Sequence, residues 1–258
     1  MSNKDDLEKA LKYSELMNSN HYDQAKKINL KNTDLSDASL RGANLRGVDL
    51  IGADLRCVDL SDANLRYADL RYADLRDAKL SGANLSNADF RCADLSNANL
   101  SNANLRSANL TSVDLLYANL SGVDLSHANL IDAYLSNANL SHTNLISANL
   151  NSVYLSSVNL EGANLSGADL RNANLSDANL ISANLLCADL GYANLSGANL
   201  SNADLIGANF ENATLIGANF ENATLTGANF ENADLRNANL FNANLKDANL
   251  TDAKHLKI

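Results

Sequence analysis

The sequence predicts an all-β solenoid, and three observations carry this prediction. Every fifth residue from Leu30 to Leu250 is leucine or phenylalanine, in 45 consecutive units without an insertion. The residue two places before this core position is alanine in 36 of the 45 units. The residue two places after it is glycine, asparagine or aspartate at 29 of the 44 positions from Asn32 to Asp247. The core positions hold 41 leucines together with Phe90, Phe210, Phe220 and Phe230.

A period of five residues excludes both a helix and a continuous strand. A helix advances about 100° per residue, so successive core residues would lie about 140° apart and would spiral around every side. Side chains of a strand alternate with a period of two, so core residues five apart would point to opposite faces. Each unit therefore needs a short extended stretch, in which the core residue and the small residue two before it point inward, followed by a corner.

The corner accounts for the residues that follow each core position. The positions one and two places after it are called here the first and second corner positions, and the position just before it is called the outward position. Of the 12 glycines in the chain, 11 lie at second corner positions. Glycine, asparagine and aspartate tolerate the positive φ that tight turns require. A corner of the same sense in every unit wraps the chain into a coil.

Residues 28 to 253 resemble the pentapeptide-repeat family, whose consensus is Ala-(Asp/Asn)-Leu-x-x, as in Ala98-Asn99-Leu100-Ser101-Asn102. The resemblance implies a right-handed quadrilateral β-helix with 20 residues in each coil. The 45 units would then form about eleven coils and a rod roughly 50 Å long. The expected organisation is an N-terminal helical cap over residues 1–27 and the β-helix over residues 28–258.

The two ends of the chain depart from the repeat. The spacing of Leu7, Ala10, Leu11 and Met17 predicts a helix over about 4–17, and a second short helix is expected through Tyr22–Lys27. This segment is expected to cover the open ladder and core of the first coil, and the alternative is a helix that binds a partner. After Leu250 the last unit places His255 where leucine is expected. Either the short tail folds over the final coil or two molecules meet end to end, as in some relatives, so the chain is expected to be a monomer or an end-to-end dimer.

Composition predicts a cytoplasmic protein without a membrane segment. Charged residues near the start interrupt any early apolar run, so no signal peptide is expected, and no stretch approaches the length of a membrane span. Cys57, Cys92 and Cys187 all occupy second corner positions on three different sides of a 20-residue coil. No disulfide or metal cluster is therefore expected within the chain, and reduced cysteines fit the cytoplasm.

Residues 20 apart should stack in columns along the rod. One column of outward positions holds Asp34, Asp54, Asp74, Asp94 and Asp114, followed by Tyr134 and Tyr154, which should stack on each other. The aspartates would repel one another without compensation. Arg56 and Arg76 lie two residues after Asp54 and Asp74, and Arg71 and Arg91 lie three residues before Asp74 and Asp94. We expect a solvated ion network here, and the alternative is an acidic groove that binds a cation. Another column holds asparagine at 99, 119, 139, 159, 179, 199, 219 and 239, which predicts an amide ladder.

No residue pattern indicates catalysis. The four histidines, at positions 21, 127, 142 and 255, do not cluster with cysteine, and no nucleophile triad, phosphate-binding loop or zinc spacing occurs. A solenoid filled with side chains also leaves no concavity of ligand size. The sequence therefore predicts a protein that is not an enzyme, with no cofactor and no catalytic, cofactor-binding or metal site.

Apolar residues at first corner positions mark a candidate interaction surface. Ile146, Leu186 and Ile206 share one column, separated by Ser166, and Ile131, Ile181, Ile216 and Phe241 lie elsewhere in the same half of the chain. Large apolar side chains that gather on a polar surface are typical of protein interfaces, and the alternative is that these are the scattered apolar residues that ordinary protein surfaces carry.

Two functional hypotheses follow. The first is a non-enzymatic structural and interaction protein of unknown biochemical role, a scaffold that binds an unidentified protein. The second is a DNA mimic that binds DNA gyrase, as the resemblance to the fluoroquinolone-resistance members of the family implies, and the net charge of −10 agrees with it. Arginines in the first half of the chain weigh against mimicry. Direct binding of nucleic acid is not expected, because the acidic chain has no basic stripe unbalanced by aspartate.

Overall fold

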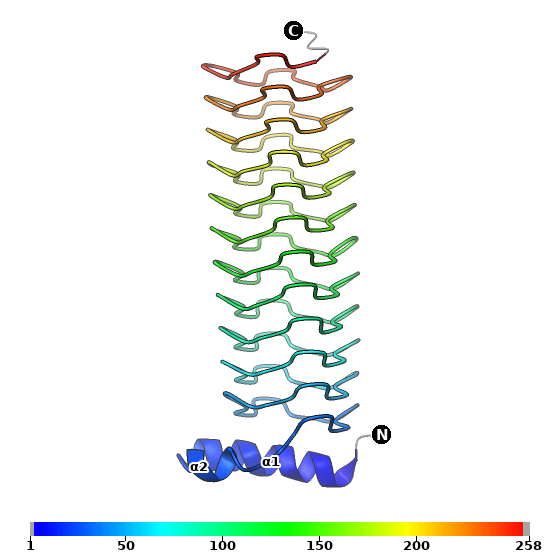
Figure 1. The fold of residues 1–258 in the computed structure, drawn as a ribbon, viewed down its shortest axis with the longest axis vertical. Helices are drawn as coiled ribbons and strands as arrows, with labels where there is room; N and C mark the ends of the chain where they lie inside the picture. Colours follow the sequence, from blue (N-terminus) through cyan, green and yellow to red (C-terminus); the bar gives the residue numbers. More distant parts are fainter. Residues whose placement is uncertain (1–2, 255–258) are drawn as a thin grey trace.

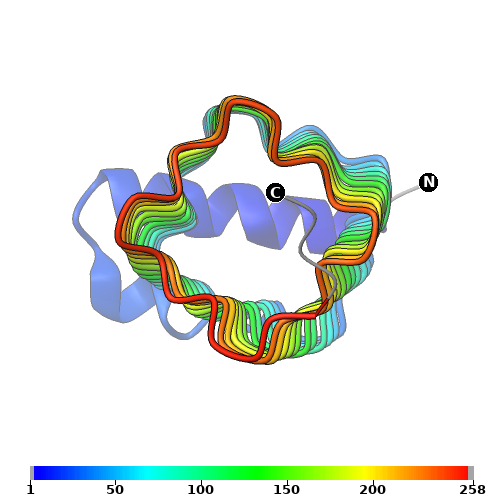
Figure 2. The same cartoon turned by 90° about the horizontal axis from the view of Figure 1, so that it is seen from above.

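The molecule is a rod of stacked coils with two helices across one end (Figure 1). The computed structural model describes residues 3–254. Helix α1 spans Lys4–Asn18 and helix α2 spans Tyr22–Ala25, close to the predicted helices over 4–17 and Tyr22–Lys27. Seen down the rod axis, the coils superpose around a common centre and the helices lie across the N-terminal opening (Figure 2). Among residues 3–254 there is no helix that is both long enough and apolar enough to cross a membrane.

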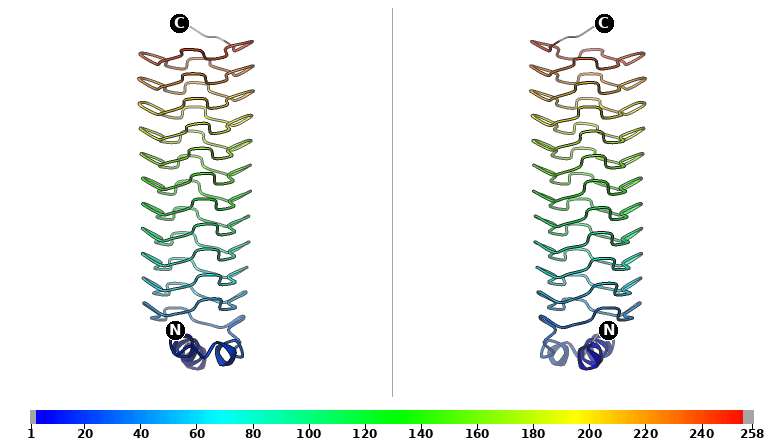
Figure 3. Two further views of the ribbon diagram at one scale, coloured as in Figure 1. Left: turned by 90° about the vertical axis from the view of Figure 1, so that its left-hand side faces the viewer. Right: turned by 90° about the vertical axis from the view of Figure 1, so that its right-hand side faces the viewer.

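Four units close one coil, and coils stack through parallel bridges. Each unit contributes a single bridging residue, at the outward position, which pairs with the residues 20 before and 20 after it; the series runs from Asp34↔Asp54 to Asp234↔Lys254. The bridges confirm the expected 20-residue coil. No longer strand is needed, because each side of the coil is only one unit wide, and the side views show the same narrow, regular stacking along the rod (Figure 3).

Every backbone N–H in a typical unit finds an acceptor, which is what a buried or stacked backbone requires. Two donate to the next coil, one to the preceding coil and one across the corner within its own unit. The fifth, at the first corner position, donates to the side-chain oxygen of the outward Asp or Asn. In one unit the donors are Leu125, Ser126, His127, Ala128 and Asn129, with distances of 2.7, 3.0, 3.0, 3.0 and 3.0 Å to their acceptors.

This side-chain bond explains the aspartate or asparagine of the consensus, in addition to the stacking expected within the columns. The Oδ1 atom of Asp124 accepts the N–H of Ser126, and the same bond recurs along the rod at 2.9 to 3.4 Å. Short polar side chains favour this local turn closure. The outward position therefore closes the corner of its own unit as well as facing its neighbours in the column.

The corners confirm the expected backbone conformation. All 45 second corner positions from Asn32 to Asp252 have a positive φ, between +53° and +70°. The N–H of the next residue donates back to the core residue's carbonyl, as from Ala128 to Leu125, so each corner is a β-turn with positive φ at its third residue. Serine, tyrosine, cysteine and histidine also occupy this position at some corners. These residues cost more in this conformation than glycine or asparagine does.

Relieving this backbone cost is expected to stabilise the rod. Tyr117 has φ of +60° and is 63% exposed, so we expect Tyr117→Asn to raise the free energy of unfolding by about 0.5–1 kcal/mol. The converse control is Gly217→Ala, where an added Cβ would meet nothing within 4 Å. We expect that change to lower stability by about 1 kcal/mol through φ alone. Thermal unfolding of both variants tests this, and equal melting temperatures for Tyr117→Asn and the wild type would contradict it.

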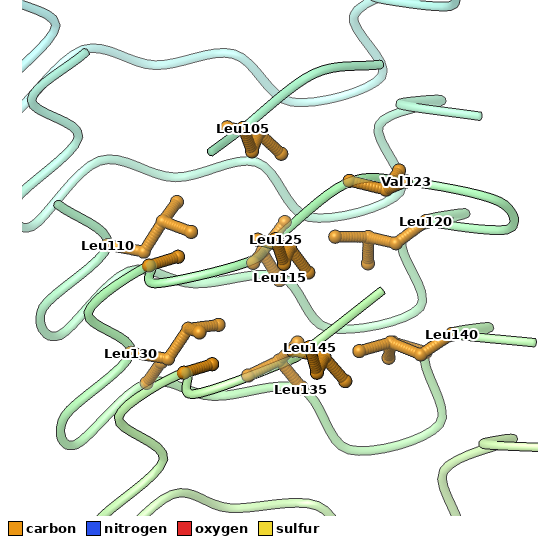
Figure 4. Packing of buried hydrophobic residues seen from close by; sticks show 14 of the residues in the cluster. Leu105, Leu110, Leu115, Leu120, Val123, Leu125, Leu130, Leu135, Leu140 and Leu145 are labelled. Carbon is orange, nitrogen blue, oxygen red and sulfur yellow. The ribbon is translucent and has the colours of Figure 1, made fainter. Parts of the chain in front are cut away.

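The core is a continuous column of leucine and alanine inside the coils. Core residues from Leu30 to Leu235 are at most 2% exposed, and the small residues between them are nearly as buried. Leucines of successive coils stack directly, as in the layers containing Leu125 and Leu145 (Figure 4). Near the C-terminal end the rings of Phe210 and Phe230 stack with centroids 4.9 Å apart, and Phe220 meets both edge-on. The interior is filled by side chains at every level.

The asparagine column forms the predicted amide ladder in two runs, one from 99 to 179 and one from 199 to 239. The Nδ2 atom of Asn159 donates to Oδ1 of Asn139 at 3.1 Å, and Asn179 donates to Asn159 at 3.0 Å. Further steps join 99, 119 and 139, and also 199, 219 and 239, at 2.9 to 3.5 Å. Each central amide therefore links three coils while its oxygen also closes its own corner.

Removing one rung of this ladder is expected to be costly for a surface residue. Asn159→Ala loses the two ladder bonds and the bond from the Glu161 N–H at 3.2 Å, so we expect a loss of about 1–3 kcal/mol in the free energy of unfolding. Asn159→Asp keeps the oxygen acceptor and loses only the amide donor, so its cost should be smaller. Denaturant unfolding measures both, and an alanine variant as stable as the wild type would refute the role of the ladder.

Helix α1 takes the place of a preceding coil at the N-terminal end. The N–H of Asp34 and the N–H of Asn44 would donate to a preceding coil, and they donate instead to Asp6 Oδ2 at 3.1 Å and Ser14 Oγ at 2.8 Å. The buried Tyr13 donates its hydroxyl to the Arg46 carbonyl at 2.9 Å. Ala10, Tyr13 and Met17 join the core cluster. The helix thus supplies side-chain acceptors and apolar groups where the first coil has no neighbour.

The opposite end of the core is open to solvent in the part of the chain that the structure describes. Leu240, Leu245 and Leu250 are only partly buried, unlike the core leucines of the inner coils. The expected fold-over of the tail concerns residues 255–258, which lie outside the described residues.

Candidate interaction surfaces

The predicted apolar residues lie in one column on one side of the rod. The bridges Asn144↔Asn164, Asn164↔Asn184 and Asn184↔Asp204 stack their units directly. Leu186 is 37% exposed and Ile206 is 38% exposed, while Ile146 is less exposed. The column of Ile146, Leu186 and Ile206 is called here the apolar column. Each side chain stands at a corner, so the three form a discontinuous ridge.

Other apolar side chains are scattered over the remaining sides. Ile131, Ile181 and Ile216 stand on three other columns and are partly exposed. Phe241 is 65% exposed on the last coil. None of these lies on the apolar column, so they serve as chemically matched controls for it.

The aspartate column carries an ion network. Arg56 binds Asp54 of its own unit through Nε at 2.8 Å, and its Nε lies 3.7 Å from Asp74 Oδ2 in the next coil. Arg76 repeats the pattern, with contacts of 2.6 Å to Asp74 and 3.6 Å to Asp94. Each guanidinium therefore bridges two carboxylates of adjacent coils. Within residues 3–254 there is no group of three or more His, Cys, Asp or Glu side chains placed to hold a metal ion.

The expected contribution of Arg71 and Arg91 to this column is wrong. Arg71 binds Asp69 at 2.7 Å and Arg91 binds Asp89 at 2.6 Å, so both serve a second acidic column on the adjacent side. The reason is local geometry: an arginine at the first corner position folds back onto the outward residue of its own unit, two positions earlier. Arg71 and Arg91 are close to Asp74 and Asp94 in the sequence, but a corner separates them and their guanidinium groups bind other carboxylates.

These ion pairs lower the pKa of their carboxylates. Hydrogen bonding by Arg56, Arg76 and Arg171 is the main cause of the lowered pKa of Asp54, Asp74 and Asp169. Burial opposes the effect in each case and is the smaller influence. The arginine side chains remain about half exposed, so solvent screens the pairs and each contributes modestly.

Stability is therefore expected to fall in acid. Because the folded pKa of these aspartates is lowered, the unfolded state binds protons first as the pH drops below about 3.8, the ordinary value. Their contribution is complete above that pH and disappears as the pH falls through the lowered folded pKa. Unfolding measured across this range should show a weaker pH dependence in the Asp54→Asn/Asp74→Asn/Asp169→Asn variant. An unchanged slope would contradict the role of the pairs.

Tyr134 and Tyr154 stack as predicted. Their ring centroids lie 4.9 Å apart and the ring planes are inclined by 2°. Both are 45% exposed, so the pair forms a flat aromatic step where the aspartate column ends.

One column carries arginines that form no ion pair among the described residues, which corrects the expectation that every basic stripe is balanced by aspartate. Arg46, Arg66 and Arg106 stand at first corner positions of the column that continues into the apolar column. The outward residues of these units are uncharged asparagines, whose Oδ1 atoms accept the arginine backbone N–H groups. The sequence already contained this signal: asparagine stands two residues before these arginines, whereas aspartate stands two residues before the arginines of two other sides, as in Asp54 and Arg56.

The cysteines and histidines form no reactive arrangement among the described residues. Cys57, Cys92 and Cys187 are free and exposed. His127 and His142 stand at exposed corners on different sides of the rod. The side chain of His142 lies over Gly162 of the next coil, where an added Cβ would come within 2.6 Å of its Nδ1.

Two protein-family models match the chain. The model described as Pentapeptide repeats matches residues 28–66, 58–91, 88–126, 183–222, 193–232 and 218–254. The model described as Pentapeptide repeat region matches residues 108–185. Together these matches extend over the whole stacked part of the rod. Among curated proteins the comparison finds no match.

Solved structures of pentapeptide-repeat proteins resemble the chain. HetL from the cyanobacterium Nostoc sp. strain PCC 7120, which is involved in the regulation of heterocyst differentiation, is 37% identical over 93% of this chain and 98% of its own, with a TM-score of 0.40. Rfr23 from the cyanobacterium Cyanothece 51142 is 36% identical over 47% of this chain and 58% of its own, with a TM-score of 0.22. QnrB1, a plasmid-mediated fluoroquinolone resistance protein, is 21% identical over 68% of this chain and 87% of its own, with a TM-score of 0.43.

Proposed function

Because this chain belongs to the pentapeptide-repeat family, whose members are generally structural or interaction proteins built as right-handed β-helix solenoids, we propose that it is a non-enzymatic scaffold that binds a protein partner. The binding surface is a side of a right-handed quadrilateral rod of about eleven coils, with no cofactor and with a cytoplasmic location. A fully packed core supports this proposal, since the filled interior leaves only the outer columns to make contacts.

The observation that carries the proposal is the apolar column. Leu186 and Ile206 have more than a third of their surface exposed to water, and the neighbouring first corner positions of their column, Ser166 and Thr226, are polar. Exposed aliphatic groups on such a surface gain free energy when a partner covers them. Because these side chains stand on stacked coils, their backbone is already ordered, and binding a partner costs little conformational entropy.

The test compares partner capture by matched variants. The immobilised wild type, the Ile146→Glu/Ile206→Glu variant and the control Ile131→Glu/Ile181→Glu are exposed to extract of the source organism. We expect a protein that the wild type and control retain and the apolar-column variant loses. Retention of the same proteins by all three, or of none by the wild type, would reject this surface.

A second candidate is DNA mimicry toward gyrase, which the net charge of −10 favours. The unpaired arginines at 46, 66 and 106 weigh against it, because they place positive charge where a duplex presents only phosphate. A gyrase supercoiling assay with added protein decides the matter: inhibition or protection from a fluoroquinolone at micromolar levels would support mimicry over the scaffold.

The partly exposed C-terminal coil bears on self-association. Partly exposed Leu240, Leu245 and Leu250 support either a monomer or a dimer formed end to end through this coil. Leu245→Arg would abolish such a dimer and leave a monomer unaffected, which solution mass measurements at several concentrations would distinguish.

A further inference from the structure

Three arginines of the described residues, Arg46, Arg66 and Arg106, take part in no ion pair, and they share one side of the rod toward its N-terminal end. Arginines on two neighbouring sides bind the outward aspartate of their own unit, as Arg76 binds Asp74 at 2.6 Å. On the side of Arg46 and Arg66 the outward residue is asparagine, which accepts a backbone N–H and carries no charge. Two guanidinium groups in adjacent coils are therefore left without a carboxylate.

No ion pair within residues 3–254 involves Lys26, Arg46, Arg66 or Arg106, although most other arginines there are paired. All four side chains are exposed. Successive coils lie about 4.8 Å apart, so Arg46 and Arg66 are in neighbouring coils, and Arg106 lies two coils, or about 10 Å, beyond the level of Arg66. Like charges held this close repel one another, and an anionic partner would relieve the repulsion.

A groove lined by aromatic rings adjoins these charges. It has a volume of about 360 Å³ and lies between the helices and the first coils, lined by Tyr13, Met17, Tyr22, Lys26, Arg46 and Tyr67. Tyr13 and Met17 are buried, while Tyr22 is 44% and Tyr67 is 48% exposed. The Arg66 guanidinium carbon lies 4.8 Å from the centroid of the Tyr67 ring, and Arg66 donates to the Tyr67 hydroxyl at 3.0 Å. Arg46 approaches the same ring at 5.7 Å.

We propose that this groove, called here the Tyr67 groove, binds an acidic peptide segment of a partner protein. An apolar side chain of the segment lies between Tyr22 and Tyr67, above Met17, and its carboxylates bind Arg46 and Arg66. Arginine suits this role because its planar guanidinium group forms bidentate hydrogen bonds with a carboxylate while it stacks on an aromatic ring. The inference rests on the proposed scaffold function and uses a surface separate from the apolar column.

Charge distribution favours a short acidic peptide over a nucleic acid. A duplex carries about one negative charge per 1.7 Å and would extend beyond the groove. One adjacent side holds Asp49, Asp69 and Asp89 at its outward positions, the opposite side holds the aspartate column, and the chain as a whole has a net charge of −10. A segment of a few residues meets the arginines and avoids those columns.

The test uses the purified full-length chain and two fluorescein-labelled peptides. One is Glu-Asp-Glu-Leu-Glu-Asp-Glu and the other is its uncharged match, Gln-Asn-Gln-Leu-Gln-Asn-Gln. By fluorescence anisotropy we expect the acidic peptide to bind at least about tenfold more tightly, and Arg46→Gln/Arg66→Gln to weaken its binding at least about tenfold. The matched control Arg76→Gln/Arg91→Gln, on the other two sides, should change binding less than about twofold.

Three results would overturn the proposal. They are equal binding of the two peptides by the wild type, equal loss of binding in the two arginine variants, and tighter binding of a single-stranded DNA oligonucleotide that displaces the peptide. The peptide comparison on the wild type stands even if a variant fails to fold. If the peptide does not bind but the apolar column still captures a partner, only the proposal for the Tyr67 groove is rejected. If the peptide binds but the wild type captures no partner, the result counts against the scaffold function instead.

Discussion

Leu185→Ala is expected to lower the free energy of unfolding by about 2–5 kcal/mol, whereas Leu186→Ala is expected to lower it by less than about 0.5 kcal/mol. The chemical change is the same and the two positions are adjacent. Leu185 is fully buried in the core, and Leu186 is 37% exposed at a corner. The first change removes transfer free energy and leaves a cavity between stacked leucines, while the second shortens a partly exposed side chain and leaves no enclosed cavity.

The two leucine variants also control for changes in the backbone conformation. Both variants retain the corner conformation and the backbone bonds of the unit, such as that from the Leu185 N–H to the Asp204 carbonyl at 2.7 Å. Guanidinium unfolding followed by circular dichroism gives the two costs on one scale. Similar costs for the two leucines would mean that the five-residue pattern does not separate the interior from the surface here.

The sequence predicted the interior almost completely, because core, small and second corner positions each impose one physical requirement. Burial selects Leu185, small volume selects Ala183, and positive φ selects residues such as Gly197. Stacking with a period of 20 residues then predicted the contact between Tyr134 and Tyr154. These features depend on position along the coil and not on the conformation of long side chains.

The arrangement of surface charges could be predicted only in part. Arg71 reaches Asp69 because its side chain folds back within the unit, a rotamer choice that spacing alone does not specify. The consensus contains the Asp or Asn that closes each corner. Predicting this hydrogen bond, however, requires knowing which backbone N–H has no acceptor in a neighbouring coil. The Tyr67 groove could not be inferred from columns at all, since Tyr13 and Met17 reach it from a helix outside the repeat.

Columns that repeat one residue type along the rod are explained by stability, whereas columns whose residue type changes point to function. The asparagine ladder repeats the same contacts in successive coils, so its residues are explained by stability. The side that carries Arg46 and later Ile146 changes from charged to apolar along the rod, and no contact within the coils requires either residue type. Both proposed binding surfaces therefore lie on this side, at different levels of a rigid support.

Tyr13→Ala is expected to cost about 3–5 kcal/mol, and Tyr13→Phe only about 1 kcal/mol. The first change empties a position that is 3% exposed above the first coil, and the second removes only the 2.9 Å hydrogen bond to the Arg46 carbonyl. In a solenoid each coil contacts only its neighbours, so the damage should begin at this end. Hydrogen exchange should show lost protection at Leu35 and Leu40, with Leu215 unchanged. If α1 served only to bind a partner, Tyr13→Ala would leave both stability and exchange as in the wild type, and the capping interpretation of residues 1–27 would fail.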